Sequence, residues 1–401
     1  MIARRPTRFR WLLALGLAFA PNLLGCATCR LQADSPDLRP CDDGFAFTQD
    51  GWKLGMRRVR PLFPDPAKDP VVLCHGLGLN GTFWTITDRN LAQLLADDGY
   101  EVFIPDLRGS GASRRVGNVG AANDLLRNTL LPEIGAGAWN MDDQAFADVP
   151  AILDYVEATT GKKRVNWVGH SLGGMLMFAH LEMTGRPDRI ATFVGMGCST
   201  DLVVTPQTDM IQANFGLRLL SHLMSTSRFA RPMRHYRPAG LAKIDKFYYS
   251  AENVDERTVS RFYGYTLEDL SGAALKQMDP WLRKGRLLSA DGAIDYASHL
   301  DRITTPTLFI AGDGDIMVDN PSMEATFAKL GATDKTMLHF GKKQGHVDDY
   351  GHCDLVWSRH APDEVFPEIV KWLDRHKPGT IWAWEQGPTP PTAPRPSSQR
   401  P

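Results

Sequence analysis

Short apolar runs recur along the chain, and stretches with helical spacing separate them. The runs have the length and β-branched content of buried strands, at 70–74, 101–105, 165–168, 190–196, 306–311 and 335–340. Helical spacing appears over 91–98, 142–158 and 362–376, and it begins again at 175. This alternation predicts the α/β class, with a mostly parallel sheet that helices cover on both faces.

Two finer features follow from the same pattern. A leading hairpin is predicted over 44–59, with Asp50-Gly51 at its turn. One buried face is predicted for the helix over 142–158, and it comprises Phe146, Val149, Ile152, Leu153 and Val156.

The segment from about 199 to 300 interrupts this rhythm, because it has no strong strand and is rich in methionine, aromatic and basic residues. Within this segment, helical spacing is seen for Phe215, Leu219, Leu220, Leu223 and Met224. Since the segment lies between two strands of the sheet, we predict a helical cap inserted between core segments 44–198 and 301–386. The alternative is a helical excursion with no part in catalysis.

The two ends of the chain differ from the core. Four arginines precede the apolar run 11–20, which is typical of an export signal and short for a membrane span. The run leads to Leu23-Leu24-Gly25-Cys26, a lipobox-like sequence, so we predict a signal over 1–26, lipidation of Cys26 and a tether over 27–43. Ordinary cleavage after Ala27 is the alternative, which would give a secreted protein. Residues 387–401 are rich in Pro, Ser and Thr and predict a disordered tail.

Composition narrows the possible partners. The 401 residues carry a formal net charge of -1 and no basic stripe after the N-terminus, so nucleic acid is not expected to bind. The six cysteines show no paired C-x-x-C spacing, and there is no H-E-x-x-H, so we expect no metal site and no cofactor. Cys29 and Cys41 could pair in an oxidising compartment. Cys74 and Cys353 are expected to be packing residues, and Cys198 ends a predicted strand.

The strand over 165–168 leads directly into Gly169-His170-Ser171-Leu172-Gly173, a G-x-S-x-G sequence. A helical pattern follows, and a strand-to-helix turn is the context that a nucleophile elbow requires. Ser171 would stand on a sharp, strained turn, and the glycines would keep bulky groups away from the strand and the helix. An ordinary glycine-rich turn is the alternative, but this context makes Ser171 the candidate nucleophile.

A serine nucleophile needs a histidine base and a carboxylate that orients it. In this architecture the chain order is serine, acid, histidine. The strand over 306–311 ends in Gly312-Asp313-Gly314-Asp315, where Asp315 is the preferred acid and Asp313 the alternative. After the last strand, His352 is preferred as the base and His346 is the alternative, because Gly351 would let the loop turn towards Ser171.

The reaction also needs two backbone N–H groups to stabilise an oxyanion. Leu172, the residue after the nucleophile, supplies one at the start of a helix. The loop His75-Gly76-Leu77-Gly78 follows an early buried strand, so the Leu77 amide is the candidate for the other.

Four segments together give the chain a family likeness: 75–78 with Trp84 nearby, 106–111, 139–152 and 350–355. In these segments the chain resembles the α/β-hydrolase superfamily, and within it the acid lipases, over about 44–377. The resemblance implies a triad of Ser171, Asp315 and His352. The lipobox-like N-terminus departs from that group. Polyester synthases, which share the sheet, are expected to use cysteine at the elbow.

These observations favour a serine ester hydrolase that acts on lipophilic esters through an acyl-enzyme intermediate. The methionine-rich cap suits an acyl chain. Two alternatives stay open: an acyltransferase or polyester depolymerase with the same triad, and a non-catalytic surface binding protein on a hydrolase scaffold. An aspartate-nucleophile reaction is disfavoured because the elbow carries Ser171. The lipid anchor would place the exported enzyme at a membrane.

Overall fold

The computed structural model describes residues 42–116, 139–184, 186–202, 231, 245–269 and 271–378. The predicted cap residues Phe215 to Met224 lie outside these ranges, as do Cys26, Cys29, Cys41, most of the tether and the C-terminal tail. No helix within the described ranges is long and apolar enough to cross a membrane.

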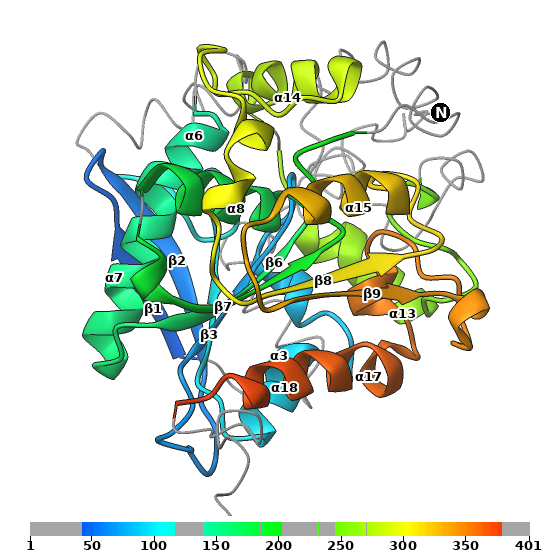
Figure 1. Cartoon of the computed structure of the whole chain (residues 1–401). Coiled ribbons are helices and arrows are strands. Elements are labelled where there is room, and N and C mark those ends of the chain that lie inside the picture. The colour runs from blue at the N-terminus through cyan, green and yellow to red at the C-terminus, as the bar shows by residue number, and fades with distance from the viewer. Residues whose placement is uncertain are drawn as a thin grey trace, which may run out of the picture.

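One mixed sheet forms the centre of the molecule (Figure 1). Its strands follow the order β1-β2-β4-β3-β6-β7-β8-β9, with β5 paired to β2. The pairs on either side of β2 are antiparallel, and all pairs from β4 through β9 are parallel. The strands are β1 (Asp42–Phe47), β2 (Trp52–Val59), β3 (Val71–Cys74), β4 (Val102–Pro105), β5 (Arg114–Arg115), β6 (Val165–His170), β7 (Ile190–Met196), β8 (Thr307–Gly312) and β9 (Lys335–Phe340).

Helices cover both faces of this sheet (Figure 1). Helices α7 (Val149–Thr160), α8 (Leu172–Thr184) and α15 (Asn320–Lys329) pack on one face, in one hydrophobic cluster. Helices α3 (Leu91–Asp97), α17 (Ala361–Glu364) and α18 (Phe366–Arg375) pack on the other face, in a second cluster. Residues of β3 alternate between the two clusters, as a strand buried on both faces requires.

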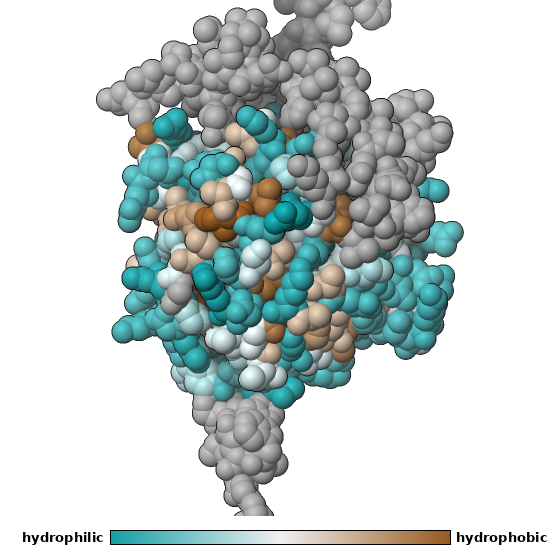
Figure 2. Space-filling model, turned by 45° about the horizontal axis from the view of Figure 1, so that its top comes forward, coloured by the Kyte–Doolittle hydropathy of each residue, from teal (hydrophilic) through white to brown (hydrophobic). Residues whose placement is uncertain are grey.

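The remaining helical elements are short or lie at the edge of the core. They are η2 (Gly81–Trp84), α6 (Met141–Asp143), η3 (Gln144–Asp148), η4 (Pro187–Arg189), α13 (Glu256–Arg261), η7 (Phe262–Thr266), α14 (Gly272–Lys284), η8 (Tyr296–Ser298), η9 (Leu300–Arg302), η10 (Lys342–Gln344) and α16 (Asp354–Trp357). Polar residues dominate the face shown in Figure 2, and apolar residues gather in a limited part of it.

The predicted α/β architecture and the leading hairpin are confirmed, and most strand bounds agree within one residue. One detail was wrong. Phe146 was predicted on the buried face of its helix, but its side chain is 37% exposed. The cause is a π-helical turn, η3, which adds a residue to the turn and rotates Phe146 outward. The same turn brings Asp148 inside, where its carboxylate accepts from Arg108 Nε over 2.8 Å.

Candidate active site

Ser171 lies at a strained turn between β6 and α8. Its φ of 53° makes it the one non-glycine residue with positive φ among the described residues. The backbone holds this conformation, because Ser171 N–H donates to the Met196 carbonyl over 2.9 Å. The serine carbonyl in turn accepts from the N–H groups of Gly174 and Met175 in the first turn of α8. Ser171 is partly exposed.

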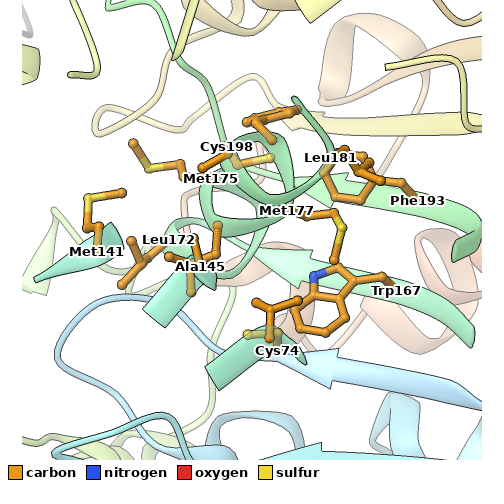
Figure 3. Packing of buried hydrophobic residues seen from close by; sticks show 14 of the residues in the cluster. Cys74, Met141, Ala145, Trp167, Leu172, Met175, Met177, Leu181, Phe193 and Cys198 are labelled. Atoms are coloured by element: carbon orange, nitrogen blue, oxygen red, sulfur yellow. The ribbon is translucent and has the colours of Figure 1, made fainter. Parts of the chain in front are cut away.

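Close contacts leave no room for a Cβ at the glycines around Ser171. A Cβ on Gly169 would lie 2.5 Å from the Gly173 carbonyl, and one on Gly173 would lie 2.4 Å from the Cys74 carbonyl oxygen. A Cβ on Gly174 would lie 2.4 Å from Cys198 Sγ. Figure 3 shows the dense packing around this helix. The start of α8 therefore lies directly against β3 and β6, which fixes the position of Ser171.

His352 and Asp315 form a buried pair. His352 Nδ1 lies 2.8 Å from Asp315 Oδ2, and the two residues are 5% and 4% exposed. The other carboxylate oxygen, Oδ1, accepts from the N–H groups of Met317 and Val318 at 2.8 and 3.0 Å. The carboxylate oxygens of Asp315 accept hydrogen bonds, so this contact is formed when the proton of the neutral His352 ring is on Nδ1, which leaves the lone pair on Nε2.

The two alternatives to this pair lie elsewhere. Asp313 accepts from Asn320 Nδ2 over 2.7 Å, at the start of α15. The ring of His346 packs on Phe340 with centroids 4.7 Å apart, and its Nδ1 lies 3.2 Å from Gly341. The structure therefore brings together Asp315 and His352, and it places Asp313 and His346 in contacts of the neighbouring loops.

Two buried side chains, His170 and Asp354, support the loop that carries His352. His170 Nε2 lies 2.9 Å from the His352 carbonyl oxygen, and the two rings are 4.6 Å apart. Burial, together with nearby His352, holds the pKa of His170 well below its usual value, so its ring is neutral.

The second support is Asp354, which accepts from Gly351 N–H at 3.0 Å and from Asn253 Nδ2 at 2.8 Å. Burial raises the pKa of Asp354 to about 6. The motif around residue 352 gave a sequence signal for Asp354. No sequence signal indicated the role of His170, apart from its place beside Ser171 in the elbow.

The loop after β3 lies beside the nucleophile. A Cβ on Gly76 would be 3.1 Å from Ser171 Cβ, so this loop passes directly over the elbow. Leu77 is the next residue in that loop, and Leu172 is the first residue of α8, where a helical N–H has no intrahelical partner. Both candidate oxyanion donors therefore lie in segments next to Ser171.

The remaining sequence candidates have packing positions. Cys74, Cys198 and Cys353 are free and buried, and burial raises the pKa of each thiol, so none is a thiolate near neutral pH. Within the described ranges there is no group of three or more side chains that could hold a metal ion.

The chain matches known proteins over most of its length. The sequence profile of a family described as alpha/beta hydrolase fold matches residues 69–358. Gastric triacylglycerol lipase of Rattus norvegicus is 25% identical over 370 residues, which cover 83% of this chain and 88% of the lipase. A probable lipase of Schizosaccharomyces pombe is 24% identical over 373 residues, with coverage of 84% and 78%.

Solved structures share the fold at lower identity. A bacterial membrane phospholipase A aligns with a TM-score of 0.57 and 16% identity, over 91% of this chain and 96% of the other. An esterase from Thermogutta terrifontis aligns with a TM-score of 0.51 and 18% identity, over 84% and 99%.

Proposed function

The chain belongs to the α/β-hydrolase family, and on that premise we propose that it is a serine hydrolase of lipophilic carboxylic esters. One observation carries the proposal: a buried, 2.8 Å His352–Asp315 pair accompanies a strained serine at a strand-to-helix turn. A strained backbone persists only where its surroundings hold it, and such strain concentrates at functional sites.

In the first half of the reaction, Ser171 Oγ attacks the ester carbonyl while His352 Nε2 accepts the serine proton. Asp315 holds the ring in the required tautomer and stabilises the imidazolium that forms. The N–H groups of Leu77 and Leu172 stabilise the oxyanion. His352 then donates its proton to the alcohol, which leaves an acyl group on Ser171.

In the second half, His352 takes a proton from water, and the resulting hydroxide attacks the acyl-enzyme carbonyl. The same two N–H groups stabilise the second oxyanion, and the acid departs as Ser171 regains its proton. An acyltransferase would use the same intermediate with an alcohol in place of water. Product analysis with added alcohol therefore separates hydrolysis from transfer.

Lipophilic esters are the proposed substrates because several of the similar proteins are named gastric triacylglycerol lipase. We also propose that 199–300 is a cap over the site. Its described part meets the loop after β3: Glu268 N–H donates to the Gly78 carbonyl over 2.8 Å, and Leu267 bridges to Leu79. A second contact joins Gln277 Oε1 to Met141 N–H over 2.7 Å.

We further propose export and lipid attachment at Cys26, with the tether leading to β1. A single acyl chain binds membranes marginally, whereas several chains anchor stably. Mass spectrometry of the mature N-terminus tests this, and an unmodified terminus after Ala27 would show plain secretion instead.

The proposed activity is tested with p-nitrophenyl esters of increasing acyl length, with Ser171→Ala as the control. Turnover that grows from short to long acyl chains and disappears in the variant supports a lipophilic ester hydrolase. Equal turnover by the variant would contradict it.

A further inference from the structure

His75 is buried in the loop after β3, and both of its ring nitrogens have backbone partners. Nδ1 lies 2.8 Å from the Gly76 carbonyl oxygen, and the N–H of Leu107 donates to Nε2 over 3.1 Å. A backbone N–H only donates and a carbonyl only accepts, so the neutral ring carries its proton on Nδ1. The residue is 2% exposed, and burial lowers its pKa, which keeps the ring neutral.

The carbonyl that His75 binds belongs to the same peptide unit as the N–H of Leu77. No peptide bond in the described ranges is cis, and in a planar trans peptide C=O and N–H point in opposite directions. The contact between Gly76 and His75 therefore directs the Leu77 N–H away from the imidazole. Because Gly76 lies against Ser171, the orientation of this peptide decides which group borders the nucleophile.

Gly76 also explains why such a support is needed. Glycine has no Cβ to restrict its backbone, so a peptide next to it can rotate more freely than others. A rotated peptide would present its carbonyl in place of its N–H, and a carbonyl would repel an oxyanion. A hydrogen bond from His75 to the Gly76 carbonyl prevents this rotation.

We propose that His75 is a positioning residue that orients the Leu77 N–H towards the oxyanion, an inference that rests on the proposed function. Leu107 fixes the tautomer of the ring, and Nδ1–H fixes the Gly76 carbonyl. Ser110 supports this arrangement, because its hydroxyl donates to the Leu107 carbonyl over 2.7 Å and lies 3.3 Å from His75 Nε2. The ring itself does not touch the substrate.

Two matched variants test the proposal. In His75→Asn the amide nitrogen can take the place of Nδ1 and donate to Gly76, whereas His75→Gln places its amide near Nε2 and Leu107. Loss of an oxyanion donor typically costs 10²–10³ in kcat, so a misdirected donor in His75→Gln should cost roughly 10- to 100-fold in kcat. KM should change by less than about threefold, because the oxyanion forms only in the transition state. His75→Asn should keep kcat within about fivefold of the wild type.

A trifluoromethyl ketone gives a second readout, because its adduct with Ser171 carries an oxyanion. Its affinity should fall in parallel with kcat across the wild type, His75→Asn and His75→Gln. Equal losses in both variants, or losses confined to KM, would overturn the positioning role.

A measurement on the wild-type enzyme tests the proposal even if a variant fails to fold. In ¹⁵N-histidine NMR, His75 should show a protonated Nδ1 and an unprotonated Nε2. The opposite tautomer would overturn the proposal. An active Ser171→Ala variant would instead overturn the proposed function, so the two failures are distinguishable.

Discussion

The carbonyl oxygen of His352 lies 2.9 Å from Nε2 of His170, so the residue before the proposed nucleophile supports the loop that carries the proposed base. The elbow and the histidine loop come from the two separate core segments of the chain, and this contact holds them together. A neutral His170 that donates through Nε2 accounts for the arrangement.

Substitution of His170 should separate support from catalysis. His170→Asn removes the donor, leaves a buried carbonyl without a partner and should cost about 1–3 kcal/mol of stability. His170→Gln can place its amide near Nε2 and should retain more activity. Steady-state kinetics and thermal unfolding of both variants check this, and a His170→Asn enzyme with unchanged kcat would contradict the supporting role.

The paired alternatives for acid and base give a second prediction. Asp315→Asn and His352→Ala should each lower kcat by several orders of magnitude, because orientation and proton transfer are both lost. Asp313→Asn and His346→Ala are the matched controls and should leave most of the activity. If either control loses more activity than its counterpart, the assignment of that loop is wrong.

Gly197 gives a prediction about packing at the pair. A Cβ there would lie 3.2 Å from both Asp315 Oδ2 and His352 Nδ1, and its φ is +53°. Gly197→Ala should therefore cost about 1–2 kcal/mol in backbone strain and also lower kcat. Gly161→Ala is the control, because Gly161 has φ of +73° and nothing within 4 Å of its Cβ position. Gly161→Ala should lose similar stability with no change in kcat. An equal loss of kcat in the two variants would contradict a specific effect of Gly197 on the pair.

Glu182 predicts a pH dependence of stability. It is buried, both of its carboxylate oxygens have no hydrogen-bond partner within the described structure, and burial raises its pKa to about 9. A carboxyl whose folded pKa lies above its unfolded value, here 4.5, binds more protons when folded. Its contribution is therefore complete at low pH and is lost as the pH rises towards 9.

Glu182→Gln should remove this dependence. In the wild type the free energy of unfolding should fall between pH 5 and 9 with a slope approaching about 1.4 kcal/mol per pH unit from this group. Urea unfolding across that range checks it, with Glu252→Gln at an exposed position as the control. An identical slope in Glu182→Gln and the wild type would show that Glu182 does not titrate in this way.

The sequence predicted the elements that local pattern controls. β-Branched runs marked the buried strands, and the glycines around Ser171 marked the elbow because close approach permits nothing larger. Phe146 was misplaced because no spacing rule signals a π-helical turn in advance. The supports from His75 and His170 depend on contacts between segments distant in sequence, such as His75 with Leu107, and periodicity carries no information about these.

The central claim is that Ser171 is the nucleophile, and covalent labelling tests it most directly. The enzyme is treated with a fluorophosphonate, digested and mapped by mass spectrometry, alongside a Ser171→Ala variant whose thermal unfolding matches the wild type. One adduct on Ser171, absent from the variant, is the predicted result. Full labelling of Ser171→Ala, or an adduct on another residue of the wild type, would contradict the claim.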